Sequence, residues 1–391
     1  MSELLESRWS DTKTALLEGL DGNKKSVMAA TLENTRKYLS EAATAGATSA
    51  GNVATLNRVI LPVIRRVMPT VIANELVGVQ PMTGPVGQIH TLRVRYADAF
   101  NSTSGTDTAA GDEALSPFKI AEGYSGAADD KAAATSALEG AAGNRLSIQI
   151  LKQTVEAKSR KLSARWTFEA AQDAQSQHGI DVEAEIMAAL AQEITAEIDQ
   201  EVLASLDSLA GSAAETYNQA AVSGTATFVG DEHAALAVQI NRVSTLLAQR
   251  TRRGAGNWAV VSPFALTILQ SATTSAFART TEGTFEAPTN TKMVGTLNNA
   301  MKVYVNTYAG DGSAVLIGYK GSSESDAAAF YCPYIPLMSS GVVLDPDTFE
   351  PTVSFMTRYG YVELNNTASS LGNAADYLGK VDITNGNVSF S

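Results

Sequence analysis

Histidines, cysteines and closely spaced carboxylates are the side chains that could do chemistry in this chain. The three histidines, His90, His178 and His233, lie far apart in the sequence, and none has a partner at the spacing of metal ligands. The one cysteine, Cys332, has no second thiol with which to form a disulfide or a zinc site, which fits a reducing compartment. We therefore expect no structural metal, and we expect Cys332 to be a small buried apolar residue.

The sequence motifs that hold phosphates or activate nucleophiles are missing as well. No glycine-rich loop ends in Lys-Ser or Lys-Thr, no GxGxxG follows a predicted strand, and there is no GxSxG. Asp345 and Asp347 flank Pro346, a pattern that is typical of turns rather than of general acids. The sequence thus predicts a protein that is not an enzyme and that needs no cofactor.

Charge is the chemistry that the sequence does offer. Between Arg165 and Arg242 there is no Lys or Arg, but there are thirteen Asp and Glu, and the stretches on either side are basic. Such blocks can pair within one chain or between identical copies. For pairing between copies, we expect a basic strand of one copy to contact an acidic helix of its neighbour. The candidate residues are Lys152, Lys158, Arg160, Lys161 and Arg165 on the basic side and Glu193, Glu197 and Glu201 on the acidic side.

Composition sets limits on the class of protein. The chain has 391 residues, 45% of them hydrophobic, so it can bury a sizeable core and should divide into two or three domains. A net charge of −12 argues against a protein that wraps nucleic acid. No run of eighteen apolar residues exists to span a membrane, and the first twenty residues do not resemble a secretory signal.

The acidic candidates lie in a stretch whose spacing predicts one long helix. From Val182 to Leu206 an apolar residue recurs at every fourth position, which fits a helix and no strand. Asp181 and the acids after it favour a helix N-terminus, and Gly211 supplies the end. At about 1.5 Å per residue the helix would be roughly 43 Å long. Its apolar row drifts around the axis, so we expect other elements to contact it from several sides.

The chain before this helix is expected to contain two amphipathic helices in 1–41, a linker of small residues in 42–52, and an apolar arm in 59–79 that Pro62 and Pro69 interrupt. Alternation then predicts a strand from Gly87, with His90 in its covered row, and two more strands near 146–150 and 162–168. Residues 98–144 are too poor in large apolar side chains to fold alone. We expect both later strands to pair with the first, as a long projecting hairpin.

Beyond the long helix, a short strand is expected at 225–229 and a second helix from Asp231, with Leu236, Ile240, Val243 and Leu247 on one face. A compact α/β module should follow, with a strand at 258–261, a helix capped by Ser262 with Pro263 at its first position, and strands near Val303, Val315 and Phe330. A long strand at 349–364 should return to the long helix.

Four collinear segments of the sequence resemble the major capsid proteins of T-even-like contractile-tailed bacteriophages. They are ELVGVQPMTGPVGQIHTLRVRYA (75–97), VEAKSRKLSARWTFEAAQDAQSQHGIDVEAEI (155–186), GYKGSSESDAAAFYCPYIPL (318–337) and FEPTVSFMTRYG (349–360). The resemblance implies an α+β chain with the HK97-like capsid fold. Larger members carry a folded insertion domain, and 98–144 is shorter and more polar than such a domain.

The resemblance also implies a division of the chain into named parts. These are an N-terminal scaffold-like segment or propeptide at 1–41, a linker and N arm at 42–85, an extended E loop at 86–168, a P domain with the spine helix at 169–253, an A domain at 254–338, and a P-domain return strand with a C-terminal tail at 339–391. A maturation protease that cuts after Glu in an Ile/Leu-x-Glu context would cleave between Glu41 and Ala42, because Leu39-Ser40-Glu41 matches that context. The alternative is that residues 1–41 stay attached and pack on the arm through Trp9 and Leu16.

The function that the resemblance implies is a major capsid protein that self-assembles, in hexamers and pentamers, into the icosahedral or prolate head shell around a double-stranded DNA genome. The implied partners are a vertex protein, a scaffold, a maturation protease, a portal and decoration proteins, with no sequence-specific DNA binding and no membrane. Assembly would occur in the host cytoplasm, and the product would be the virion capsid. The alternatives are an encapsulin-like compartment shell and an extracellular filament or surface-layer protein.

Overall fold

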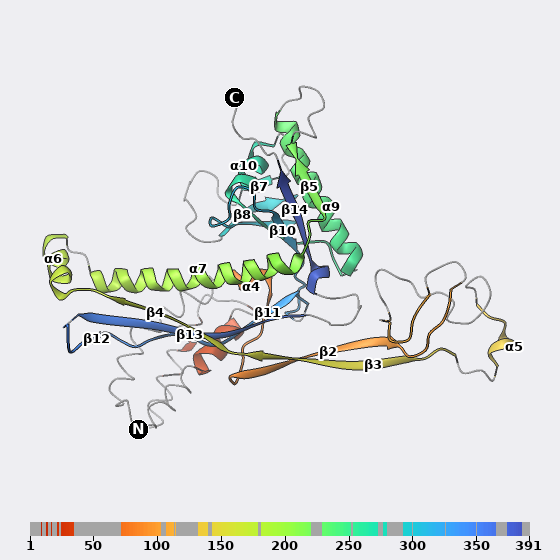
Figure 1. Cartoon of the computed structure of the whole chain (residues 1–391), viewed down its shortest axis with the longest axis horizontal. Helices are drawn as coiled ribbons and strands as arrows, with labels where there is room; N and C mark the ends of the chain where they lie inside the picture. The colour runs from red at the N-terminus through yellow and green to blue at the C-terminus, as the bar shows by residue number, and fades with distance from the viewer. Residues whose placement is uncertain are drawn as a thin grey trace. The chain divides into compact units, whose positions relative to one another are not determined.

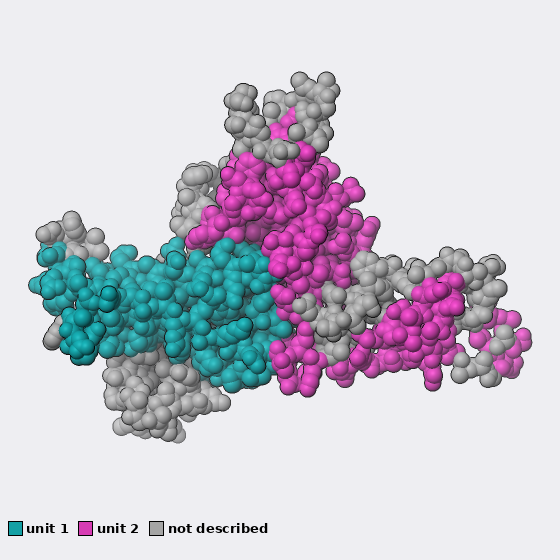
Figure 2. Space-filling view, viewed as in Figure 1, with its two compact units in different colours: residues 1–87, 155–205, 330–362 teal, residues 88–154, 206–329, 363–391 magenta. Residues whose placement is uncertain are grey.

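The computed structural model of the chain has two compact units, each built from segments that are far apart in the sequence. Unit 1 comprises residues 1–87, 155–205 and 330–362, and unit 2 comprises 88–154, 206–329 and 363–391 (Figure 2). The residues that the structure describes are 9, 13, 14, 17, 22, 25–34, 72–102, 107–112, 114, 132–139, 143–178, 181–219, 229–251, 253–272, 277–279, 292–298, 300–324, 326–348, 350–364 and 374–384.

Unit 1 is built on a five-stranded sheet. Its order is β1 (Gly78–Val79), β11 (Ala329–Ser339), β13 (Pro351–Glu363) and β12 (Val343–Leu344), and β4 (Lys158–Arg165) also pairs with β13. β1 pairs with β11 in parallel, whereas β4 and β12 pair with β13 in antiparallel register. Val353, Phe355 and Tyr359 of β13 are buried, as the alternation of that strand predicts. The short helix α4 (Ala73–Leu76) leads into β1.

The predicted long helix is confirmed as α7 (Val182–Ala210), which runs beside β4 and β13 (Figure 1). Its first two turns are largely exposed, and Leu190 is its first buried residue. From there to Leu206 buried residues lie on several faces, among them the adjacent Ile194 and Thr195 and the adjacent Ile198 and Asp199. The helix ends as expected, because Gly211 adopts a φ of +68°, which is a left-handed conformation that glycine favours. The helix α6 (Phe168–His178) precedes α7.

Unit 2 contains a seven-stranded sheet covered by two helices. Its order is β5 (Glu215–Asn218), β14 (Leu378–Thr384), β10 (Val315–Gly318), β6 (Trp258–Val261), β9 (Met301–Val305), β8 (Lys292–Leu297) and β7 (Phe277–Arg279). The helix α9 (Val229–Thr251) buries Leu236, Ile240, Val243 and Leu247 in one core with this sheet, so the predicted apolar face is confirmed. In α10 (Pro263–Ser271), Ser262 caps the helix and Pro263 begins it, as predicted. The short η3 (Ala374–Tyr377) leads into β14.

The third sheet is a two-stranded ribbon of β2 (Val86–Tyr96) and β3 (Leu146–Glu156). It forms the predicted hairpin with one strand fewer than expected, because the strand near 162–168 pairs with β13 instead. The short helix α5 (Thr135–Leu138) lies between the ribbon strands in the sequence. The ribbon is thus two-stranded, and the strand expected as its third member belongs to the sheet of unit 1.

The domain boundaries expected from the sequence differ from the structure at three more places. The helix α9 was grouped with the spine helix but packs on the seven-stranded sheet. The strand near Phe330 was expected in the α/β module, but it is β11 of unit 1. The C-terminal tail was grouped with the return strand and no strand was expected in it, but residues Leu378–Thr384 form β14, which pairs with β10 and β5. The local apolar pattern predicted α9 and β11 but not β14, and the choice of pairing partner depends on residues distant in the sequence.

Residues of the N-terminal segment that the structure describes are helical, and they include 25–34. Gly22 has a φ of +58°, which is a left-handed conformation that favours glycine. Trp9 donates its ring N–H to Glu33 at 3.4 Å, and Lys13 Nζ lies 3.1 Å from the same carboxylate. Expectations for Leu16 and Leu39, for the linker 42–52 and for most of the arm lie outside the described residues. Of the strand expected at 225–229, only Val229 is described, and it belongs to the helix α9.

Candidate assembly surfaces

A charged cluster joins the basic strand to the acidic helix within unit 1. Arg160 of β4 lies with Nη2 2.6 Å from Oε2 of Glu201, and its Nη1 contacts Oε1 of Glu197. Its Nε donates to the hydroxyl of Tyr359 at 2.5 Å, and that hydroxyl donates to Glu201. The β4–β13 register sets Arg160 opposite Thr357, so Tyr359 is its diagonal neighbour on the same face. One guanidinium therefore connects two strands and a helix.

The environment of the cluster keeps its ions charged. Burial alone would raise the pKa of Glu201, but the hydrogen bonds from Tyr359 and Arg160 outweigh burial and hold that pKa below its usual value. Burial and the hydrogen bond to Glu201 raise the pKa of Tyr359, so its hydroxyl stays protonated and can donate. Burial works against the charge of Arg160, yet its bonds to Glu201 and Tyr359 raise its pKa overall. The arrangement holds charge in place, and no group in it is poised to transfer a proton.

This geometry corrects part of the prediction for contacts between copies. Arg160, Glu197 and Glu201 were expected to pair across two chains, but they pair within one. Arg165 also has an internal partner, Glu350, at 3.6 Å. The physical reason is register: β4 lies on β13 beside α7, so its inward residues reach the helix of their own chain.

The remaining candidates lie on exposed positions. Lys152 of β3, Lys158 and Lys161 of β4 and Glu193 of α7 are exposed, and none forms an ion pair among the described residues. Lys161 points to the opposite face of β4 from Arg160, because their positions differ by one. Contacts of these four residues with a second copy stay a prediction.

The ribbon carries an apolar row that is exposed among the residues the structure describes. Leu146, Ile148 and Ile150 alternate along β3, which predicts a strand with one covered face. In the single chain their side chains are 58%, 68% and 67% exposed. His90 of β2, expected in the covered row, is also exposed. Alternating large aliphatic side chains that face solvent are typical of a surface that another molecule covers.

Where the ribbon meets the segment 99–144, an ion pair fixes the two ends of that segment. Arg145 contacts Asp98 with Nε and Nη2 at 3.1 Å each, and its backbone N–H donates to the same carboxylate at 2.9 Å. These side-chain and backbone bonds lower the pKa of Asp98. The pairing keeps Asp98 and Arg145 together, so the 46 residues between them need not determine the register of β2 and β3.

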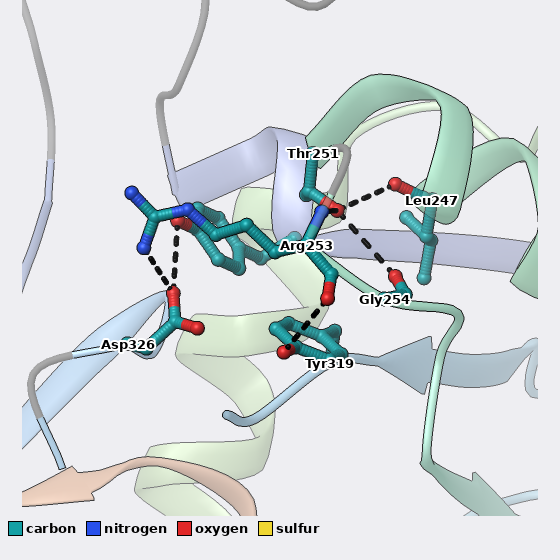
Figure 3. Close-up of polar contacts among 7 residues, drawn as sticks. Leu247, Thr251, Arg253, Gly254, Tyr319 and Asp326 are labelled. Carbon is teal, nitrogen blue, oxygen red and sulfur yellow. Dashed lines mark hydrogen bonds and ion pairs between the residues drawn. The ribbon is translucent and has the colours of Figure 1, made fainter. Parts of the chain in front are cut away.

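In unit 2, a second polar cluster closes the C-terminal end of α9 (Figure 3). Thr251 donates its hydroxyl to Leu247 O at 2.8 Å, and Arg253 Nη1 lies 2.5 Å from Asp326 Oδ1. Tyr319 donates to Arg253 O at 3.3 Å, and a Cβ on Gly254 would lie 2.6 Å from the Tyr319 ring, so only glycine fits there. The basic block after α9 thus contributes an internal pair, as does Arg242 with Glu215 at 2.9 Å.

The residues first considered for catalysis have structural roles where the structure describes them. Cys332 is buried as expected, and burial raises the pKa of its thiol to about 11. Asp347 N–H donates to Asp345 Oδ1 at 3.1 Å, which is the expected turn. His233 is buried, with Nδ1 2.5 Å from the Ser271 hydroxyl. Among the described residues, no group of three or more His, Cys, Asp or Glu could hold a metal ion, and no helix is long and apolar enough to cross a membrane.

Two important residues were missed by sequence reasoning. Tyr359 is central to the charged cluster, yet the sequence marked it as one of several alternating residues of a strand. Asp199 is 1% exposed, in the middle of a helix where acids were counted as surface charge. Asp199 directly follows Ile198 of the apolar row, and this position was the signal in the sequence that its side chain could be buried.

A long helix beside a sheet, a separate α/β unit and an extended ribbon with an uncovered apolar face describe a structural protein that assembles through its surface. The α+β class is confirmed. The family described as major capsid protein Gp23 matches residues 53–383. The chain belongs to this family, and it is a major capsid protein of a tailed bacteriophage, located in the virion capsid.

Individual relatives agree with the family match. The major capsid protein of Vibrio phage KVP40 is 28% identical over 83% of this chain and 80% of its own. That of Enterobacteria phage T4 is 28% identical over 84% of this chain and 79% of its own. Among solved structures, one described as the capsid of Myoviridae phage XM1 has a TM-score of 0.45 at 10% identity, covering 80% of this chain and 92% of that chain.

Proposed function

We propose that this protein forms the icosahedral or prolate head shell around double-stranded DNA, and that the ribbon of β2 and β3 makes the main contact between neighbouring copies. The observation that carries the proposal is the exposed row of Leu146, Ile148 and Ile150. Burying these side chains on association would contribute about 25 cal/mol per Å² of apolar area. A second copy is the occupant that we propose, because membership of a capsid protein family implies self-assembly.

The charge of the chain supports the second part of this proposal, the enclosed genome. The net charge is −12, so an inner wall made of this protein would repel DNA rather than bind it tightly. DNA would then be contained by the closed shell, without recognition of its sequence. The proposed partners are a vertex protein, a scaffold, a maturation protease, a portal and decoration proteins, with assembly in the host cytoplasm and no catalysis by this chain.

Processing after Glu41 is a separate part of the proposal. The sequence Leu39-Ser40-Glu41 precedes a linker of small residues, and the family match begins only at residue 53. A protease needs an accessible extended segment, which small residues provide. Removal of residues 1–41 would leave Ala42 as the new N-terminus and would free space inside the shell.

Electron microscopy of the purified chain, expressed alone and with a scaffold protein, tests the shell proposal. We expect hollow closed particles with five-fold and six-fold clusters of subunits. A monodisperse monomer at every salt and protein concentration, with the scaffold supplied, would overturn it. The double variant Ile148→Ser with Ile150→Ser, compared with the control Gln149→Ser, then tests whether the apolar row of the ribbon makes the contact.

A further inference from the structure

Among the described residues of the N-terminal segment, Asn34 forms hydrogen bonds with the sheet of unit 1. The amide nitrogen Nδ2 of Asn34 lies 2.7 Å from Met82 O and 3.2 Å from Tyr334 O. An Asn side-chain amide has two N–H donors, so it can bond to both carbonyls at once. Met82 N–H in turn donates to Pro333 O at 3.0 Å, which places this contact where the pairing of β1 with β11 ends.

The helical residues before Asn34 present one buried face. Val27 and Thr31 share that face with Asn34, since their positions are separated by four and three. Val27 is 4% exposed and Thr31 is 0% exposed, as are Met28 at 2% and Leu32 at 0%. The outer side of the same helix holds Glu33, which pairs with Trp9 and Lys13 of the preceding helical residues. The segment is therefore amphipathic, with its amide donor on the packed face.

The way the segment is attached suggests that this contact can be released. Its partners Met82 and Tyr334 lie 48 and 300 residues away in the sequence, so the contact is not part of a local fold. Residues 42–52 are Ala, Thr, Gly and Ser with a single Asn. Residues of these types lack the large apolar side chains that build a core. The family match also begins after this linker, at residue 53.

We propose that the sheet of unit 1 carries a binding site for a helix, that residues 25–34 of the same chain occupy this site, and that Asn34 holds them there by bonding to Met82 O and Tyr334 O. The occupied site is an interaction surface that the chain covers by itself. If the segment leaves, the carbonyls of Met82 and Tyr334 become available to another helix. This proposal needs neither shell formation nor cleavage at Glu41, so it can fail or succeed independently of them.

Hydrogen exchange on the full-length chain, before assembly, tests the role of Asn34. The variant Asn34→Asp keeps the shape of the side chain but removes both donors and sets a negative charge against two carbonyl oxygens. We expect amides of 25–34 to exchange at least about tenfold faster, because two hydrogen bonds are lost. Asn298→Asp is the matched control, since Asn298 is exposed in a turn of unit 2, and it should leave 25–34 unchanged. Unchanged exchange of 25–34 in Asn34→Asp would overturn the proposal.

A competition experiment on the unmodified chain covers the case in which the variant fails to fold. A peptide of residues 22–36 is added to uniformly ¹⁵N-labelled chain, whose own fragments are then distinguished by mass. A tethered segment has an effective concentration of about 1 mM, so the peptide is used at several times that value, ~5 mM. We expect the parent peptide to accelerate the exchange of residues 25–34 in the chain. The peptide that carries N34D should leave that exchange rate unchanged. No displacement by the parent peptide would show that the site is not exchangeable, which contradicts the proposal.

Discussion

Arg160 Nη2 lies 2.6 Å from Glu201 Oε2, so the basic strand and the acidic helix are joined inside a single chain. The bond is made on the side of β4 that faces α7, and Tyr359 fixes its geometry from the neighbouring strand. Ion pairs that a sequence sets far apart can thus stabilise the fold of one subunit before any assembly takes place.

Substitution of Arg160 should therefore destabilise the unassembled chain. Arg160→Met leaves Glu201 without its cation and removes a charged hydrogen bond, and we expect a loss of about 1–2 kcal/mol of unfolding free energy, discounted because the cluster is partly exposed. Urea unfolding measures it. The control Arg165→Met removes the ion pair with Glu350, in which the two charged groups lie 3.6 Å apart and the arginine is 73% exposed. This substitution should lower the unfolding free energy by less than about 0.5 kcal/mol. Equal effects of the two substitutions would contradict this account.

Asp199 should make the stability of unit 1 depend on pH. Its Oδ1 accepts from Ile72 N–H at 2.8 Å, but its Oδ2 is buried without a hydrogen-bond partner. Burial raises the pKa of Asp199 from 3.8 to about 7. The folded chain therefore keeps a proton that the unfolded chain releases, so the contribution of Asp199 is fully present below pH 3.8 and is lost as pH rises through 7.

The test compares the parent chain with Asp199→Asn between pH 5 and 8. The parent should lose up to about 1.4 kcal/mol of stability per pH unit until pH 7, relative to the variant. The other ionisable groups near Asp199 do not titrate in this window: burial raises the pKa of Tyr331 and Tyr359, while hydrogen bonds keep that of Glu201 low. A constant difference between the two proteins across the range would refute the prediction.

The apolar row of the ribbon should matter for assembly and not for folding. The double variant Ile148→Ser with Ile150→Ser removes side chains that are 68% and 67% exposed in the single chain. We expect an unchanged urea midpoint for the unassembled chain and a large loss of assembled particles in sedimentation. Gln149→Ser changes the opposite face of β3 and serves as the control. Normal assembly of the double variant would remove the ribbon from the interface.

Much of the fold could be predicted from local pattern. The fourfold spacing gave α7 to within a few residues, Ser262 and Pro263 gave the start of α10, and alternation gave β13. These signals succeed because the period of a helix or strand is visible in the spacing of apolar residues close together in the sequence. The same spacing does not determine which strands pair with one another. β11 and β14 could each have joined the sheet of the other unit on the evidence of their alternation alone.

The candidate contacts were harder to predict because charge does not specify its partner. Arg160 and Lys161 are adjacent basic residues in the same predicted strand, yet one points to α7 and the other is exposed. The register of β4 with β13 decides which alternate residues of β4 face α7, and the sequence of β4 alone does not determine that register. Leu146, Ile148 and Ile150 were predicted only as an alternating strand, and alternation alone does not show that these side chains are 58%, 68% and 67% exposed.

Processing after Glu41 has its own test. Mass spectrometry of capsid protein from mature, DNA-filled particles should find Ala42 at the N-terminus, because Glu41 completes the Leu-x-Glu context and precedes the small-residue linker. The variant Glu41→Gln should retain residues 1–41, whereas Glu33→Gln should be cut normally. Met1 or Ser2 at the N-terminus of mature protein would show that the segment is a permanent part of the shell.

The most direct test of the central claim is a cryo-electron microscopy map of assembled particles in which side chains of the ribbon are visible. The exposure of Leu146, Ile148 and Ile150, now 58%, 68% and 67%, should fall to nearly zero because the surface of a neighbouring copy covers them. Particles in which all three side chains still face solvent would contradict the claim that this row holds the shell together.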